Sequence, residues 1–309
     1  MSSAPFPIPA EVTAWIRSVF AEVNQRTSAK LSRLPNVHET SLDMTLIEQL
    51  SQYAAPFRFS SNWLVRLETH YLGGPRYWGA WEIADVGILV VFRRNGVVER
   101  TKIALLQSKR LYPIEAEAPA EDHPTDYELG FGRLLQAEQE FKSTVQRRNF
   151  TFSDQSRYRA LEYKGEQYKA ILNYIVEQKI PVHYLLHNPL RLPSRATLPV
   201  EAAKNTADSG SCEIGCRVVS AEVLDSRLNV VKLKKFENPS FAQVAGTTET
   251  LDTACWRPEY FVADLVIGCQ EGYRGGINPM QDSKLFIVFS RRSGPISAAI
   301  SITIDASAG

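Results

Sequence analysis

Three polar residues in apolar surroundings are the first candidates for chemistry in this sequence. Asp85 interrupts a run from Ile83 to Phe92 in which nearly every other residue is apolar. A carboxylate at the mouth of a buried strand is costly unless a cation, a hydrogen-bond donor or a metal ion compensates it. Gln107 and Lys109 stand two positions apart in the next apolar stretch, so they project from one face of a strand. An amide group and an ammonium group are therefore predicted near one another.

Two strands joined by a tight turn are expected to position these side chains. The first is predicted over Ile83–Phe92, where β-branched and large residues dominate as in a strand buried on both faces. Asn95-Gly96 follows, a dipeptide that adopts positive φ at both turn positions and closes a hairpin. The second strand is predicted over Arg100–Arg110, which carries Gln107 and Lys109 near its end.

This arrangement resembles the core of the PD-(D/E)xK nuclease superfamily, in which an Asp on one strand precedes a polar-x-Lys pair on the next. The sequence has Asp85 and then Gln107-Ser108-Lys109, with Gln where most members carry Asp or Glu. The Gln form is similar to the Q-x-K variant of Mrr-like restriction nucleases and related bacterial defence nucleases. The resemblance implies an α/β fold with a restriction-endonuclease-like mixed central sheet flanked by helices.

The same resemblance implies metal-dependent hydrolysis of a DNA phosphodiester, with Asp85, Gln107 and Lys109 as the catalytic residues. A hard divalent cation, Mg²⁺ or Mn²⁺, neutralises charge on the phosphoryl oxygens and lowers the pKa of a bound water. Asp85, the side-chain oxygen of Gln107 and the main-chain carbonyl of Ser108 would hold it. Lys109 would orient the attacking water or meet the developing charge. Because Gln carries no charge, metal binding is expected to be weaker unless another carboxylate compensates.

Two upstream residues are candidates for that carboxylate. Residues 61–71 are expected to form a helix, because Ser61-Asn62 can cap a segment with apolar residues at helical spacing. Glu68 lies near the end of this segment, where Mrr-like relatives place an additional metal-binding Glu. Glu82 is the second candidate for this metal-binding carboxylate, provided that the start of the strand bends and turns its side chain toward Asp85. The alternative for Glu68 is a solvated position on the surface of the helix.

Charge is unevenly distributed in the middle of the chain. Between Tyr112 and Glu128 there are six acidic residues and no Lys or Arg, which predicts a solvated loop or an acidic flap that competes with nucleic acid. Helices are expected over Phe131–Arg148 and Asp154–Gln178. Between residues 142 and 169 there are seven basic and three acidic residues, interleaved with tyrosines that either stack on bases or line a core. The predicted nucleic-acid-binding residues are Arg147, Arg148, Arg157, Lys164 and Lys169.

Bulk properties set broad limits. The chain has 309 residues, is 44% hydrophobic and carries a formal net charge of +1, so it can bury a large core, and its net charge indicates no particular partner. No apolar run approaches the length of a membrane span, so we expect a soluble cytoplasmic protein without a membrane partner. The four cysteines are expected to be reduced thiols, with a structural zinc site as the alternative: Cys212, Cys216, Cys255 and Cys269.

Residues 1–200 are expected to form the nuclease-like domain and residues 201–309 a β-rich α+β extension, packed on the same core or forming a small domain of its own. Two amphipathic helices without site residues are expected before the hairpin, and a buried strand carrying His183 and His187 after it; neither histidine is expected to have a role. The remaining expected elements are helices over Glu11–Val23, Ser41–Ala54 and Glu259–Gln270 and strands over Pro181–Pro189, Glu213–Ser220, Leu228–Lys235, Lys284–Ser290 and Ile296–Ile304.

The function that the resemblance implies is that of a metal-dependent endonuclease acting in bacterial defence against foreign DNA. Because such an enzyme endangers its host, control by a regulatory protein or by homo-oligomerisation is expected. The first alternative is a catalytically inactive nuclease-fold subunit that binds nucleic acid or protein in a larger complex, which the Gln at position 107 suggests. The second is a zinc-stapled assembly subunit. Whether the substrate is DNA or RNA is left open.

Overall fold

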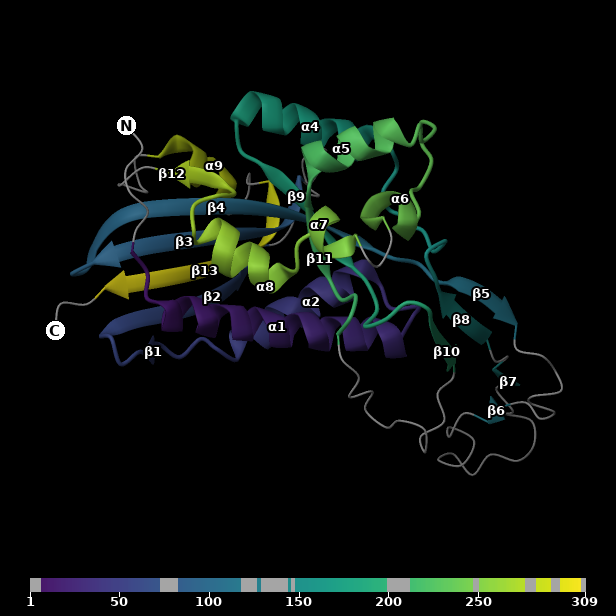
Figure 1. Cartoon of the computed structure of the whole chain (residues 1–309), viewed down its shortest axis with the longest axis horizontal. Helices are drawn as coiled ribbons and strands as arrows, with labels where there is room; N and C mark the ends of the chain where they lie inside the picture. The colour runs from purple at the N-terminus through teal and green to yellow at the C-terminus, as the bar shows by residue number, and fades with distance from the viewer. Residues whose placement is uncertain are drawn as a thin grey trace.

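An eight-stranded mixed sheet forms the centre of the molecule in this computed structural model, which describes residues 7–72, 83–117, 127–128, 144–145, 148–198, 212–246, 250–275, 282–289 and 295–306. The strand order is β1-β2-β13-β3-β4-β9-β11, with β12 paired to β4 (Figure 1). The strands are β1 (Phe57–Arg58), β2 (Trp63–Tyr71), β3 (Ala84–Arg94), β4 (Val97–Arg110), β9 (Val182–His187), β11 (Arg217–Ser220), β12 (Tyr273–Gly275) and β13 (Ile296–Ala306).

The expected hairpin lies in the middle of this sheet. β3 and β4 are antiparallel, and Asn95 and Gly96 have φ of 51° and 78°, so the turn is the one that the sequence predicts. β3 is parallel to β13 on its other side, and β4 is parallel to β9. The sheet is therefore mixed, and the expectation of an α/β protein with a mixed sheet and flanking helices is confirmed.

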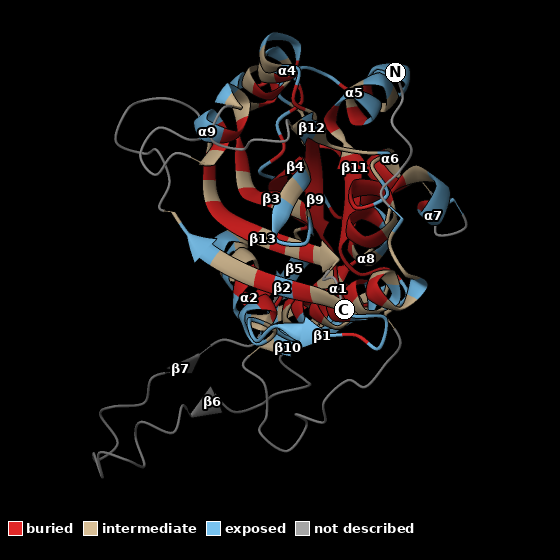
Figure 2. Cartoon of the chain, turned by 90° about the vertical axis from the view of Figure 1, so that its left-hand side faces the viewer, coloured by how far each residue is buried: buried red, intermediate tan, exposed pale blue. Residues whose placement is uncertain are grey.

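Helices cover both faces of the sheet (Figures 1 and 2). We call the two faces the α4 face, which carries Ile103, Leu105, Tyr184 and Leu186, and the α1 face, which carries Val86, Ile88, Val90, Leu106 and Leu185. The helices are α1 (Ala10–Arg33), α2 (Glu39–Ser51), α4 (Glu166–Gln178), α5 (Ala221–Val230), α6 (Phe241–Ala245), α7 (Leu251–Ala254), α8 (Pro258–Tyr260), the π-helical turn η4 (Phe261–Val266) and α9 (Ser283–Phe289).

Each face of the sheet has its own hydrophobic core, because the apolar residues of the central strands alternate between the two sides. On the α4 face, Leu105 and Tyr184 belong to one buried cluster with Ile171 of α4 and Leu224 of α5. On the α1 face, the alternate residues of β3 belong to a second cluster with α1, α2 and η4. Figure 2 shows the central strands buried between these layers and the outer sides of α4 and α5 exposed.

Smaller strands lie beside this body. β5 (Ile114–Glu117), β8 (Arg148–Phe152) and β10 (Ser194–Leu198) form a three-stranded sheet in the order β10-β8-β5, and β6 (Tyr127–Glu128) pairs with β7 (Thr144–Val145). The first part of the predicted acidic loop is thus strand β5, and residues 118–126 lie outside the described residues. Arg148, expected at the end of a helix, begins strand β8, and residues 131–143 of that expected helix are likewise not described.

The clearest error in the predicted elements concerns residues 61–71, which form strand β2 and no helix. Val65 and Leu67 are buried on one side of this strand, so alternation and not helical spacing describes its apolar residues. β2 pairs along its whole length with β13, a partner more than 200 residues away in the sequence that no local pattern reveals.

The predicted type or extent of three other elements is also wrong. The expected helix 154–178 is shortened to α4, which begins after Gly165, while residues 154–165 form turns. Residues 228–230 end helix α5 where a strand was expected, and residues 283–289 form helix α9 instead of one arm of a hairpin. Helices α1 and α2 and strands β9 and β13 lie where elements of the same kind were expected. The first part of the expected helix 259–270 is formed by α8 and η4.

The last third of the chain contributes to the central sheet. β11 pairs with β9, β12 pairs with β4, and β13 lies between β2 and β3. A division near residue 200 therefore does not separate the strands of this sheet. Of the helices that the structure describes, none has the length and the apolar composition needed to cross a bilayer.

Candidate functional site

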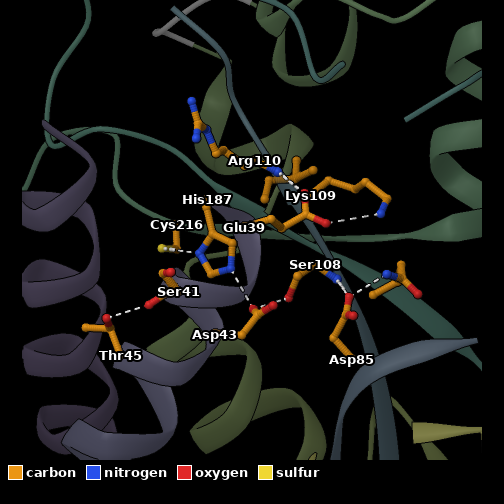
Figure 3. Close-up of polar contacts among 12 residues, drawn as sticks. Glu39, Ser41, Asp43, Thr45, Asp85, Ser108, Lys109, Arg110, His187 and Cys216 are labelled. Atoms are coloured by element: carbon orange, nitrogen blue, oxygen red, sulfur yellow. Dashed lines mark hydrogen bonds and ion pairs between the residues drawn. The ribbon is translucent and has the colours of Figure 1, made fainter. Parts of the chain in front are cut away.

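Asp85 and Gln107 lie opposite each other where β3 and β4 leave the core, because Val86 pairs with Leu106 in the hairpin. The Asp85 Oδ2 atom accepts a hydrogen bond from Gln107 Nε2 and a second one, of 2.7 Å, from the main-chain N–H of Ser108 (Figure 3). Both side chains lie on the α4 face by strand alternation. The carboxylate that interrupts the apolar run is thus held by two donors from the neighbouring strand.

Lys109 follows on the same face and meets a carboxylate from helix α2. Its Nζ atom lies 3.4 Å from Glu39 Oε1, and Glu39 Oε2 accepts a 2.8 Å hydrogen bond from the main-chain N–H of Arg110. The Lys109 side chain is only 5% exposed, so the carboxylate faces an ammonium group with little access to water. Glu39 is the first residue of α2, where the helix dipole also favours a negative charge.

Asp43 lies one turn further along α2 and reaches the α1 face of the sheet. Its Oδ1 atom accepts a 2.5 Å hydrogen bond from Ser108 Oγ and lies 2.9 Å from His187 Nε2. His187 Nδ1 in turn lies 3.5 Å from Cys216 Sγ. Burial disfavours the charged imidazole, but hydrogen bonds to Asp43 and Cys216 raise the pKa of His187 to about 10.

Ser108 connects the two sides of the sheet. Its main-chain N–H is bonded to Asp85, and its hydroxyl group is bonded to Asp43 (Figure 3). The next residue on the α1 face, Arg110, is buried with its guanidinium group 2.6 Å from the carbonyl oxygen of Pro35 and stacked on Tyr112 at 4.2 Å. Desolvation lowers the pKa of Arg110 from its usual value. Helix α2 and the segment before it therefore fix the end of β4 from several directions.

The donor atoms at Asp85 fit a hard divalent cation. Gln107 is 2% exposed, and its Oε1 atom is buried with no hydrogen-bond partner among the described residues. A buried carbonyl oxygen without a donor is costly, and a cation or a water would satisfy it. With the Asp85 carboxylate and the Ser108 carbonyl it supplies oxygen donors of the kind that Mg²⁺ prefers. Within the described ranges no group of three or more His, Cys, Asp and Glu side chains is placed to hold a metal, so the amide and main-chain oxygens are essential to such a site.

The structure does not bring Glu68 to this place. Glu68 pairs with Ser301 of β13, which pairs with Leu89 of β3, so Glu68 lies two strands from β3 and ~13 Å along the sheet from Asp85. Its carboxylate is 3.5 Å from Ser301 Oγ. The expected position of Glu68 on a helix beside the hairpin is therefore wrong, and the carboxylates of α2 that approach the Q-x-K residues are Glu39 and Asp43. Glu82 lies outside the described residues.

The predicted nucleic-acid-binding residues do not share one helix face. Arg148 lies on β8 and pairs with Glu115 at 2.5 Å, and Arg157 lies in the turns before α4 and pairs with Glu237 at 3.1 Å. Lys164 donates to Asn229 at 3.2 Å, and Lys169 is exposed on α4. Arg147 falls outside the part of the chain that the structure describes. Three of the interleaved tyrosines are buried and therefore line the core: Tyr158, Tyr163 and Tyr168.

Sequence reasoning missed Glu39, Asp43 and His187. The spacing of Glu39 and Asp43 places them on one side of α2, a signal that was visible beside the apolar stripe of that helix. Neither histidine of β9 was expected to have a role, yet His183 lies 3.3 Å from Glu271 and His187 lies 2.9 Å from Asp43. All four cysteines are free thiols.

Comparison with protein-family models, with curated proteins and with solved structures finds no match for this chain.

Proposed function

We propose that the protein is a metal-dependent nuclease whose site is formed by Asp85, Gln107 and Lys109 at the end of the β3–β4 hairpin. One observation carries the proposal: the buried Oε1 atom of Gln107 lacks a donor among the described residues while its Nε2 atom holds Asp85. An acceptor left open next to an oriented carboxylate is the arrangement that a divalent cation completes. Lys109 lies on the same face, two residues further along the strand.

Each residue has a separate task in the proposed reaction. Asp85, Gln107 Oε1 and the Ser108 carbonyl would hold Mg²⁺ or Mn²⁺, which supplies charge neutralisation at the phosphate and a more acidic bound water. Gln107 Nε2 and the Ser108 N–H fix the direction of the Asp85 carboxylate. Lys109 contributes an ammonium group that meets developing negative charge, and Glu39 positions it.

The order of elements also supports the proposal. The antiparallel pair β3–β4 is followed, after strands β5 to β8, a series of turns and helix α4, by β9, which is parallel to β4. A helix and then a strand parallel to the x-Lys strand are the continuation that the PD-(D/E)xK resemblance implies. Hydrolysis of DNA, a role in bacterial defence, and control by a partner protein or by homo-oligomerisation remain part of the proposal on the strength of that resemblance.

The test is cleavage of supercoiled plasmid DNA with Mg²⁺, with Mn²⁺ and with EDTA. We expect wild type to cut only when metal is present, and Asp85→Asn to lose cleavage while remaining folded. Glu68→Gln is the matched control, since it neutralises a carboxylate of the same sheet that lies far from Asp85. Equal cleavage by wild type and Asp85→Asn would refute the assigned site.

A nuclease fold that has lost turnover is the second candidate, and the contacts of Asp85 and Lys109 favour it. Two donors already hold the Asp85 carboxylate, and Glu39 already lies beside Lys109. For such a protein we expect no cleavage by wild type with either metal, together with metal-independent binding of nucleic acid. Gln107→Glu, which restores the more common acidic residue, then either recovers cleavage or leaves the protein inactive, whereas an active wild type excludes this candidate.

A further inference from the structure

A cavity of about 390 Å³ lies at the start of helix α4 on the α4 face of the sheet. Its size falls within the range of small-molecule pockets. Aromatic and acidic side chains line it: Tyr168, Tyr184, Phe236, Glu162 and Glu166. Its wall therefore combines aromatic surface with carboxylate acceptors.

The cavity lies on the same face of the sheet as the proposed catalytic residues. Tyr184 of β9 is the direct neighbour of Gln107 in the parallel pairing of β9 with β4, so the two side chains leave the same face of adjacent strands. Neighbouring strands are ~4.8 Å apart. A ligand in the cavity would thus lie on the same face of the sheet as Asp85 and Gln107, on the side of β9.

Two residues beside the cavity have unusual backbone conformations. Phe236 has φ of 65° and Lys164 has φ of 56°, and both are bulky residues in the left-handed region. Such strained residues are enriched at ligand-binding sites. Phe236 is nevertheless 56% exposed, so its ring is presented to the cavity and to solvent without the burial that normally stabilises a phenylalanine. The Nζ atom of Lys235 lies 4.5 Å from the centre of that ring.

The polar groups of the cavity are mainly acceptors. Glu162 and Glu166 are exposed carboxylates on its wall, and the hydroxyl of Tyr168 is already bonded to Asp225 at 2.9 Å. Tyr184 is 1% exposed, and in the described part of the chain its hydroxyl has no hydrogen-bond partner. A fitting ligand is therefore planar and presents hydrogen-bond donors to a carboxylate. Lys164 and Lys235, which are exposed and directly precede the lining residues Gly165 and Phe236, suit an attached phosphate.

We infer that this cavity binds the guanine base of the nucleotide next to the phosphate that is cleaved. Guanine presents two adjacent donors, its ring N–H and its exocyclic amino group, which one carboxylate can accept together. Uracil and thymine present a single N–H, and hypoxanthine lacks the amino group. The base stacks on Phe236, as unpaired bases do on aromatic side chains. This assignment to the cleaved nucleotide rests on the proposed function, whereas binding of the base itself does not.

The test is calorimetric titration of the full chain, without metal, with GMP, IMP, UMP and ribose 5-phosphate. We expect GMP to bind about tenfold more tightly than IMP or UMP, and ribose 5-phosphate to show no measurable binding. Phe236→Ala should weaken GMP binding about tenfold. Phe286→Ala is the matched control, because this phenylalanine on α9 is 67% exposed and does not line the cavity.

The inference is overturned if GMP does not bind, if ribose 5-phosphate binds as well as GMP, or if Phe236→Ala and Phe286→Ala bind GMP equally. Replacing both Glu162 and Glu166 by Gln should remove the preference for GMP over IMP, and an unchanged preference also overturns the inference. Cleavage assays separate this inference from the proposed function. If the protein binds GMP but cuts no DNA, the guanine-binding cavity stands and the nuclease proposal is refuted. If it cuts DNA but does not bind GMP, only the guanine-binding cavity is refuted.

Discussion

Replacing Glu39 by Gln removes the carboxylate that faces the ammonium group of Lys109. Deleting one partner of a buried ion pair costs about 3–5 kcal/mol, because the other charge stays buried and unpaired. Glu39 is itself 19% exposed, and Gln retains an acceptor for the main-chain N–H of Arg110. We therefore expect the free energy of unfolding to fall by about 2 kcal/mol.

Urea denaturation followed by circular dichroism measures this change. Glu48→Gln is the matched control, because Glu48 is exposed on the same helix and should change the free energy of unfolding by less than about 0.5 kcal/mol. In a Lys109→Met background the cost of Glu39→Gln should largely disappear, since no buried ammonium group is left unpaired. Equal stability of Glu39→Gln and Glu48→Gln, or an unchanged cost in the Lys109→Met background, would refute the assignment of Glu39 as the partner of Lys109.

Three further predictions concern pH and the backbone. The pKa of His187, raised from 6.5 to about 10, makes its contribution to stability complete below pH 6.5 and lost as the pH rises towards 10. The stability advantage of wild type over His187→Gln in urea denaturation should shrink over that interval, and a constant difference would contradict the coupling to Asp43. Gly215→Ala should lower the free energy of unfolding by about 2–3 kcal/mol, because at φ 65° its Cβ would lie 2.5 Å from Cys212 Sγ. Gly96→Ala, at φ 78° with open space around it, should cost only about 1 kcal/mol, and equal losses for the two variants would show that the close approach at Gly215 is unimportant.

The hairpin and its polar residues could be predicted from the sequence because the signals are local. Alternation, the Asn95-Gly96 turn and the two-residue spacing of Gln107 and Lys109 are sufficient to place the two strands and the side-chain faces. The pairing of β3 with β13 on its other side could not be predicted in this way. β13 enters the sheet between β2 and β3 from the end of the chain, and a run such as 63–71 reads as strand or helix until that partner is known.

The carboxylates of the site show the same limit. Asp85 was identified because it is conspicuous in an apolar run, whereas Glu39 and Asp43 look like ordinary surface residues of an amphipathic helix. Only the packing of α2 against the end of β4 brings them to Lys109 and Ser108. Glu68 was a candidate because residues 61–71 were expected to be a helix beside the hairpin, so its wrong expected position followed from the error in the fold.

The measurement that tests the proposed site most directly is a Mn²⁺ titration, with free Mn²⁺ followed by electron paramagnetic resonance and plasmid cleavage followed in the same samples. We compare wild type, Gln107→Glu and Gln107→Met. If Gln107 Oε1 is a metal ligand, Gln107→Glu should bind Mn²⁺ about tenfold more tightly and retain cleavage, because it adds a charge at the ligand position. Gln107→Met should lose both binding and cleavage. A wild-type protein that binds no Mn²⁺ and leaves the plasmid intact, or a Gln107→Met variant that binds and cuts as wild type does, would contradict a metal-dependent nuclease site at Asp85 and Gln107.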